Sequence, residues 1–350
     1  MFDDEDFFIR LLTISSKRRN QRPHHSHTAP SSTSPFSSIS PCSLGKEGLA
    51  AKTPTTVFAT FEKTVSELGD KKALFQKRPK TGQKAADVEW TSWTWSEYKK
   101  EAFDFAKSLI SLGFEPFDTI NIIGFNAPEW FFSNFGAIAA GGVAAGIYTT
   151  NLSEACHYIS SHSKAKVVVC EGLKQLEKYL TMKNKLPNLK ALVVYGLWDD
   201  GATIPEEMKK KSPVPVYTYD EFRKLGEAIA EEKVQERIDA ALPGHVCTLI
   251  YTSGTTGPPK AVMITHDNIT WTVNPILLAS RRGSFTNNDV AISYLPLVSV
   301  VDVGGQNDYF RFLRSNRLSF ISCVVESHCG SNVGSSRTHG HRSPTLLCPA

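Results

Sequence analysis

The sequence lacks the segments that would place it in a membrane or on a secretory route. It contains no run of about 20 apolar residues, which a transmembrane helix needs, so we expect none. The most apolar stretch, 130–147, is broken by Ser133, Asn134 and several glycines, and we interpret it as a buried helix followed by a strand. Acidic residues fill positions 3–6, where a secretory signal carries basic ones, so the N-terminus does not match such a signal.

Paired cysteines are missing as well. The chain has seven cysteines, an odd number, and none of them stands in CxxC spacing. This pattern favours reduced thiols in a cytoplasmic protein over a disulfide framework. Two of them, Cys156 and Cys170, lie among apolar residues and are expected to belong to the core. The seven are Cys42, Cys156, Cys170, Cys247, Cys323, Cys329 and Cys348.

A strong charge of one sign is also absent. A net charge of +4 over 350 residues is too small to indicate a nucleic-acid partner. The last forty residues hold five arginines and one glutamate, which accounts for the whole excess. With 41% hydrophobic and 21% charged residues, the chain is typical of a globular protein with a sizeable core.

Composition divides the chain into three parts. Residues 1–53 are rich in Ser, Thr, Pro and His, and such a segment buries too little apolar surface to offset its ordering entropy, so we predict a disordered arm. The histidines within 24–27 are interpreted as a solvated cluster and not a metal site, because no cysteine or carboxylate stands nearby. Residues 54–300 are predicted to form the folded domain, and residues 301–350 an irregular, disordered tail.

Helical and strand patterns alternate along the folded part, which predicts an α/β fold with a mainly parallel sheet flanked by helices. Ser96 is expected to cap the second helix, and Asn126 the third through an Asn-x-x-Glu capping box with Glu129. We assign no element to the polar stretch 200–240. Predicted helices cover 57–68, 96–112, 126–140, a stretch from 153 and 174–180, and predicted strands cover 73–75, 89–95, 119–125, 143–148, 166–170, 189–195 and 247–251.

Several aromatic and histidine residues are interpreted as structural. The three tryptophans within 90–95 are expected to be strand and core aromatics and not a ligand box. The Trp-Phe-Phe run at 130–132 is expected to pack in the core and not to form an acyl-binding surface. His157 and His162 are interpreted as helix-surface residues, because no third ligand is spaced to join them in a metal site.

The residues with the clearest chemistry are 248–260, TLIYTSGTTGPPK. An apolar, strand-like run opens into glycine-spaced hydroxyl residues and ends in Lys260. Small residues let the backbone approach a polyphosphate, N–H and hydroxyl groups converge on it, and the lysine adds a positive charge. The predicted binding residues are Thr252, Ser253, Gly254, Thr255, Thr256, Gly257 and Lys260.

Three other interpretations fit less well. A Walker A loop ends in Gly-Lys-Ser/Thr, whereas here Pro259 precedes Lys260 and Ala261 follows it. A surface turn between two strands would explain a single TSG but not the whole string after an apolar strand. An unrelated Rossmann-type binding protein is disfavoured, because no GxGxxG follows any predicted strand.

The segment LIYTSGTTGPPKAVMITHDNITWT resembles the signature loop of the adenylate-forming superfamily, which includes acyl-CoA synthetases, luciferases and the adenylation domains of peptide synthetases. GFNAPEWFFSNFGAIAAGGVAAGIYTTNLSEACHYI and KQLEKYL narrow the similarity to long-chain fatty-acid–CoA ligases of the bubblegum type. The similarity runs from about residue 54 to 297, and Ala261 stands where most members carry glycine. It implies the N-terminal part of the adenylate-forming enzyme fold.

This resemblance implies activation of a fatty acid in two steps. The carboxylate would attack the α-phosphate of ATP to give an acyl-adenylate and pyrophosphate, and the thiol of coenzyme A would then displace AMP. The signature loop would hold the β- and γ-phosphates, with Mg²⁺ sharing their charge. No catalytic nucleophile or base is expected in this part of the chain. The expected location is the cytoplasm, with peripheral association with the endoplasmic reticulum membrane as an open alternative.

The resemblance weakens after a second family landmark, SYLPL at 293–297. Family members continue with Ser-His, whereas this chain has VSVVD at 298–302, so the histidine is absent. We interpret the tail as an alternative end, from a frameshift or a retained intron, and expect little ligase activity from the chain alone because most of the nucleotide and coenzyme A contacts of the family would be missing. The alternative is a non-catalytic variant that acts as a weak nucleotide- or protein-binding module.

Overall fold

The computed structural model describes residues 51–180, 186–252 and 258–279, with the backbone alone for 273–279. It also describes single residues at 36, 37, 39, 40, 42, 45, 47, 182, 290, 293, 297 and 298. All of these belong to the second of two compact units, Pro35–Ala350. The histidines within 24–27, the tail 301–350 and most of the 1–53 arm lie outside the described residues, so the predictions made for them stay predictions.

Where the N-terminal arm is described, it contacts the folded domain. Phe36 is buried in the core, and the Ser40 N–H donates to the Gly244 carbonyl over 3.1 Å. At these positions the chain is therefore held by packing and by a backbone hydrogen bond.

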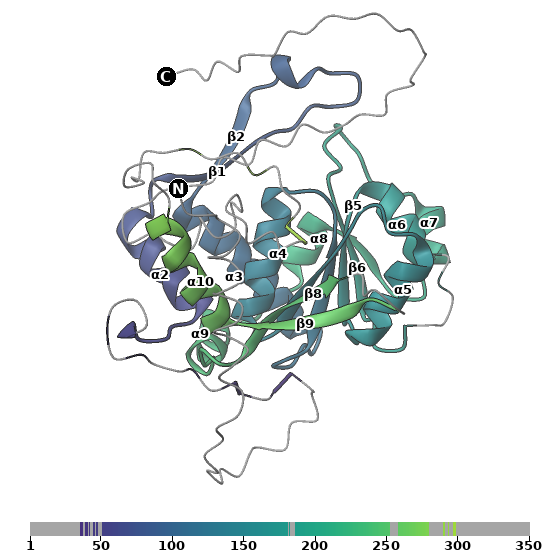
Figure 1. Ribbon diagram of the computed structural model, residues 1–350. Helices are drawn as coiled ribbons and strands as arrows, with labels where there is room; N and C mark the ends of the chain where they lie inside the picture. Colours follow the sequence, from purple (N-terminus) through teal and green to yellow (C-terminus); the bar gives the residue numbers. More distant parts are fainter. Residues whose placement is uncertain are drawn as a thin grey trace, which may run out of the picture. The chain divides into compact units, whose positions relative to one another are not determined.

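A seven-stranded sheet in the order β7-β6-β5-β3-β4-β8-β9 forms the centre of the described domain (Figure 1). Neighbouring strands are parallel except for the last pair, in which β9 runs antiparallel to β8. The α/β class and the mainly parallel sheet are thus confirmed. The strands are β3 (Thr119–Ile123), β4 (Val143–Ile147), β5 (Val167–Glu171), β6 (Ala191–Tyr195), β7 (Val216–Thr218), β8 (Val246–Thr252) and β9 (Lys260–Thr265).

The central strands are buried along almost their whole length, because helices cover both faces of the sheet, and most of their residues are apolar. Along β5, Val167 and Val169 point into one core, while Val168 and Cys170 point into the other. The first core lies under α2 (Val57–Leu68), α3 (Trp95–Ser111), α4 (Pro128–Ala139), α8 (Tyr219–Lys224), α9 (Glu231–Asp239) and α10 (His266–Ala279). The second lies under α5 (Ser153–His162), α6 (Gly172–Leu180) and α7 (Glu206–Lys211) (Figure 1).

Aromatic side chains fill the space between the helices of the first core. The rings of Phe61 in α2 and Phe135 in α4 lie 4.7 Å apart between their centroids. Trp130, Phe131 and Phe132 are all nearly fully buried, so the prediction that this run packs in the core is confirmed. None of the helices in the described residues combines the length and the apolar character that a membrane crossing needs.

A separate antiparallel hairpin precedes α3, as the strand patterns predicted. It consists of β1 (Lys72–Lys77) and β2 (Trp90–Thr94), with the short 3₁₀ helix η2 (Ala85–Asp87) between them. The three tryptophans within 90–95 have different environments: Trp95 is buried, Trp93 packs edge-on against Phe132, and Trp90 is 40% exposed.

Two predicted helix caps are wrong. The N-cap of α3 is Thr94 and not Ser96: the Thr94 hydroxyl accepts from the Glu97 N–H over 3.1 Å, and the Glu97 carboxylate accepts from the Thr94 N–H over 2.6 Å. This reciprocal pair satisfies two N–H groups at the helix start, which a cap at Ser96 would not. The N-cap of α4 is Ala127, whose methyl side chain cannot accept a hydrogen bond, while the Asn126 carboxamide is engaged elsewhere. The predicted helix ends hold, since Gly113 and Gly141 adopt φ of 69° and 75° after α3 and α4.

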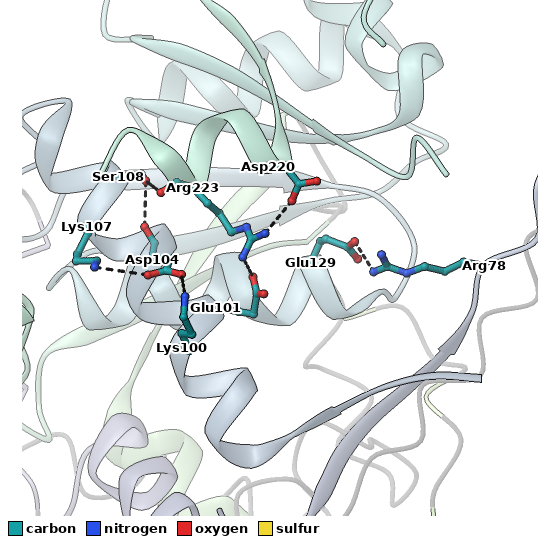
Figure 2. Close-up of polar contacts among 9 residues, drawn as sticks. All are labelled: Arg78, Lys100, Glu101, Asp104, Lys107, Ser108, Glu129, Asp220 and Arg223. Atoms are coloured by element: carbon teal, nitrogen blue, oxygen red, sulfur yellow. Dashed lines mark hydrogen bonds and ion pairs between the residues drawn. The ribbon is translucent and has the colours of Figure 1, made fainter. Parts of the chain in front are cut away.

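The polar stretch 200–240, left unassigned from the sequence, contains α7, β7, α8 and α9. Helix α8 is fixed to α3 by polar contacts, which Figure 2 shows. Arg223 of α8 pairs with Glu101 of α3 at 2.6 Å and with Asp220 at 2.8 Å. The Ser108 hydroxyl, fully buried in α3, lies 3.0 Å from the Arg223 carbonyl and donates to it. These polar contacts add to the packing of Tyr219 and Phe222, which α8 buries in the first core.

Candidate functional site

The strands β3, β4 and β8 lie side by side and parallel, so their carboxyl ends meet at one edge of the sheet, called here the carboxyl edge. In sheets of this kind, ligands bind at the carboxyl edge. The chain leaves β8 there after Thr252 and returns at Lys260, which are register partners across the β8–β9 pair. Of the seven predicted binding residues, the structure thus brings these two together. Residues 253–257 lie outside the described part of the chain, so their predicted role is untested.

Strand β9 itself was not predicted. The sequence placed Lys260 at the end of a loop, whereas the structure makes it the first residue of a six-residue antiparallel strand. The connection between β8 and β9 therefore has the topology of a turn between two strands, which the surface-turn interpretation also requires. The two interpretations now differ only in what the connection binds.

Two tyrosines attach this hairpin to α5. The Tyr158 hydroxyl donates to the Pro259 carbonyl over 3.0 Å, on the arm that leads into Lys260. On the other arm, the Tyr251 hydroxyl lies 2.9 Å from Nδ1 of His162. The rings of Tyr158 and His162 stack with their centroids 5.6 Å apart, so one patch of α5 holds both arms.

His162 thus has a partner that the sequence did not reveal. It is exposed on the helix surface, as predicted, but its ring contacts the strand that leads into the loop. Burial raises the pKa of Tyr251 to about 12, so its hydroxyl stays protonated and neutral at ordinary pH. Tyr251 therefore adds no charge to the site.

Lys260 is the cation of this hairpin. Its side chain is exposed, and no ion pair joins it to a carboxylate among the described residues. A lysine held at a strand end beside a sheet's carboxyl edge, with its charge uncompensated by the described part of the chain, can attract an anion.

Asn126 lies three residues after the end of β3, at the same edge. Its side chain forms hydrogen bonds with two residues from far along the chain. Its Nδ2 donates to the Ser293 hydroxyl over 2.7 Å and to the Ser293 carbonyl over 3.2 Å. Its Oδ1 accepts from the Leu297 N–H over 3.1 Å. Sequence reasoning missed this role because the partners stand 167 and 171 residues further along the chain.

The turn after β3 is fixed on its other side by β5 and β6. The Phe125 N–H donates to the Glu171 carboxylate over 2.8 Å, and the Tyr195 hydroxyl donates to the Phe125 carbonyl over 3.2 Å. With its backbone held at both groups, Phe125 presents a side chain that is 56% exposed. Burial raises the pKa of Glu171, because water no longer solvates the charged form fully.

The AMP-binding enzyme family matches residues 61–306. The chain belongs to this family. Among its curated relatives, the long-chain-fatty-acid–CoA ligase ACSBG2 of Xenopus laevis is 40% identical over 255 residues, which are 73% of this chain and 32% of the relative. ACSBG2 of Gallus gallus is 41% identical over 263 residues, with the same shares. These relatives are of the bubblegum type, so the resemblance inferred from the sequence is confirmed.

This AMP-binding family member spans about a third of the length of those curated relatives. Its fold is shared with the A domain of a carboxylic acid reductase from Segniliparus rugosus, solved in complex with AMP and a co-purified carboxylic acid. The TM-score is 0.59 at 19% identity, and the match covers 77% of this chain and 44% of that one. The predicted adenylate-forming fold is thus confirmed for the described domain.

Two further kinds of reactive group, metal ligands and cysteine thiols, bear on the chemistry of the described residues. The described residues contain no group of three or more His, Cys, Asp or Glu side chains that could hold a metal ion. Cys156 and Cys170 are buried in the core as predicted, and burial raises the pKa of Cys156 to about 11. A protonated, enclosed thiol is a poor nucleophile, so these two cysteines are packing residues.

Proposed function

We propose that this chain acts in ATP-dependent activation of a long-chain fatty acid to its coenzyme A thioester. The fatty-acid carboxylate attacks the α-phosphate of ATP, which releases pyrophosphate and forms the acyl-adenylate. The thiol of coenzyme A then attacks the acyl carbon, loses its proton and displaces AMP. The observation that carries the proposal is the β8–β9 connection, which opens at the carboxyl edge between Thr252 and Lys260 and carries the family's signature sequence.

In this proposal the loop holds the nucleotide. The hydroxyl and N–H groups of 252–257 surround the β- and γ-phosphates, and Lys260 neutralises part of their charge. The described residues fit an anionic group there, because the Lys260 side chain is exposed and has no carboxylate partner among them. Mg²⁺ would arrive with the phosphates, since it commonly keeps water and phosphate oxygens as ligands and needs few from the protein.

The relatives support the choice of substrate class. Two curated proteins that are about 40% identical to this chain are named as long-chain-fatty-acid–CoA ligases. Catalysis in the described part consists of positioning and charge stabilisation, so we assign no nucleophile or general base to it. We further propose a cytoplasmic location with peripheral association at the endoplasmic reticulum membrane, which flotation of the protein with vesicles of that membrane's lipids would test.

The test separates nucleotide binding from the whole reaction. Titration calorimetry of the purified chain with ATP and Mg²⁺ measures the loop directly, and binding is expected. Mass spectrometry of the product formed from palmitate, ATP and coenzyme A measures thioester formation. Absence of ATP binding would contradict the proposal at its first step. Binding without thioester formation would instead favour the alternative of a non-catalytic, nucleotide-binding module.

A further inference from the structure

A cavity of about 200 Å³ lies at the amino ends of β4 and β8. It is lined by Gly142, which directly precedes β4, by Val246, the first residue of β8, and by residues at the C-terminal end of α9. Thr252, after which the chain enters the proposed phosphate loop, is the last residue of β8. The cavity therefore lies at the opposite ends of the strands from the proposed nucleotide site.

The walls of this cavity are mostly apolar and include Phe117, Ile138 and Ala241. An apolar cavity of about 150 Å³ holds a benzene ring. A cavity of about 200 Å³ thus has room for a ring of that size together with one small polar group. Its size and its apolar walls favour a small organic molecule over a polyphosphate.

Two histidines that line the cavity carry their protons on Nε2. The Nδ1 atom of His245 accepts from the Leu242 N–H over 3.0 Å, and Nδ1 of His266 accepts from the Val57 N–H over 3.3 Å. A ring nitrogen that accepts holds no proton, so each ring is neutral and its Nε2–H is a donor. Within the part of the chain that the structure describes, neither Nε2–H has a hydrogen-bond partner.

These two donors are close together and withdrawn from solvent. His266 is only 4% exposed. Burial, and then the nearness of His245, lower its pKa, so the two rings act on each other. A buried donor without a partner is costly. The cavity therefore offers two neighbouring N–H groups to a ligand that can accept them.

Arg237 of α9 adds a positive charge to the lining. Its Nη1 donates to the Phe114 carbonyl over 2.7 Å and to the Ala140 carbonyl over 2.9 Å, which fixes the guanidinium in place. Among the described carboxylates, only that of Glu115 pairs with it, at 3.9 Å, and that side chain is 73% exposed. Glu236 also lines the cavity but is exposed, so water screens its charge. Burial lowers the pKa of Arg237, because its charge is incompletely solvated, and an anion in the cavity would stabilise that charge.

We propose that this cavity is a second binding site, which takes a small carboxylate with an apolar body, of the size of benzoate. The carboxylate accepts from the Nε2–H groups of His245 and His266, and the guanidinium of Arg237 supplies the opposite charge. The apolar body occupies the space beside Phe117 and Ile138. Neither the signature loop nor ATP takes part, so the inference is independent of the proposed function.

The experiment titrates the full chain, labelled with nitrogen-15 in its histidines, with benzoate and with neutral benzamide. Proton–nitrogen correlation spectra report the tautomer of each ring and any shift of its Nε2 signal. In His245→Asn the carboxamide oxygen replaces Nδ1 as the acceptor for the Leu242 N–H, so that chiefly the Nε2 donor is lost. Ala241→Leu keeps both donors and fills part of the cavity. His157→Asn is the matched control, because His157 lies in α5 and does not line the cavity.

We expect the Nε2–H tautomer at His245 and His266 in the wild type. Benzoate should shift both Nε2 signals saturably with a Kd on the order of 1 mM, as its small size predicts. Benzamide, which has the same size and no charge, should bind about tenfold more weakly. His245→Asn should raise the Kd for benzoate about tenfold, Ala241→Leu should abolish the saturable shift of the His266 signal, and His157→Asn should change neither. Should His245→Asn fail to fold, Ala241→Leu supplies the comparison.

Three results overturn the inference. Absence of a saturable shift of the His245 and His266 signals in the wild type would show that the cavity takes no carboxylate. Equal Kd values for benzoate and benzamide would show that it does not select an anion. An unchanged Kd in both His245→Asn and Ala241→Leu would place the binding elsewhere on the chain. None of these measurements involves ATP, so a failure of the proposed function leaves the test of this site intact.

Discussion

Tyr158 and Pro259 stand 101 residues apart and are joined by a hydrogen bond of 3.0 Å from the tyrosine hydroxyl to the proline carbonyl. Proline cannot donate a backbone hydrogen bond, so its carbonyl is its one polar contact with the rest of the fold. The bond fixes the residue immediately before Lys260 to α5. It sets the position from which the lysine side chain extends.

Replacement of Tyr158 by Phe should therefore loosen the returning arm of the hairpin. Loss of one partly buried hydrogen bond is expected to lower the free energy of unfolding by about 1 kcal/mol. Urea denaturation followed by circular dichroism measures this change. Tyr217→Phe serves as the control, because its hydroxyl has no hydrogen-bond partner within the described residues. Equal effects of the two variants would show that the hydrogen bond from Tyr158 to Pro259 does not stabilise the hairpin.

Replacement of Lys260 by Ala should weaken ATP binding. A charge-assisted hydrogen bond contributes about 1.5–3 kcal/mol, so the Kd should rise by at least about tenfold. Lys174→Ala is the matched control, since Lys174 is also exposed but lies in α6. Calorimetry with ATP and Mg²⁺ at low and physiological salt gives both values. If Lys174→Ala weakens binding as much as Lys260→Ala does, the lysine acts through net charge and not through a local contact.

Replacement of Arg223 by Ala should destabilise the fold without touching the site. Glu101 is only 19% exposed and would lose the guanidinium that balances its charge, at a cost of about 2 kcal/mol. Lys63→Ala breaks an exposed pair with Glu67 and should change stability by no more than about 0.5 kcal/mol. Chemical denaturation compares the two. A negligible effect of Arg223→Ala would mean that apolar contacts alone hold α8.

Glu171 gives a pH prediction. Burial raises its pKa in the folded state above the ordinary value of 4.5, so the folded protein binds this proton more readily than the unfolded chain. The favourable contribution of Glu171 to the free energy of unfolding is fully present below the unfolded pKa. It is lost as the pH rises through the folded pKa. Glu171→Gln keeps an acceptor for the Phe125 N–H and does not titrate. The stability of the wild type minus that of Glu171→Gln should therefore fall in urea titrations as the pH rises above 4.5, and a constant or rising difference would refute the assignment.

The sequence predicted most of the sheet because strands buried on both faces are continuous apolar runs. ALVVY at 191–195 shows this, and all its residues are buried. TINII at 119–123 is buried as completely, although it includes Thr119 and Asn121. The stretch 200–240 carried a weaker signal. In α9, only Val234 and Ile238 are buried, one turn apart in an otherwise charged helix, so a single pair of apolar residues had to reveal the element.

The polar details of the site were harder to predict for two reasons. Both Thr94 and Ser96 are good caps, and only the position of Glu97, three residues after Thr94, distinguishes them. Asn126 also fits a capping pattern with Glu129, yet its actual partners are fixed by tertiary structure far along the chain. Local patterns name the residue types that a site needs, whereas the pairing of distant residues depends on how the sheet is ordered.

Because β9 runs antiparallel to β8, it leads from the carboxyl edge of the sheet back to the opposite ends of the strands. Its six residues start at Lys260 and end next to His266, whose Nδ1 accepts from the Val57 N–H at the start of α2 over 3.3 Å. Burial lowers the pKa of His266 to about 3, so the ring stays neutral and able to accept at ordinary pH. The lysine proposed to bind the phosphates thus lies at the start of a strand whose other end is hydrogen-bonded to α2. A force on the lysine side chain is therefore transmitted along β9 and opposed by that bond.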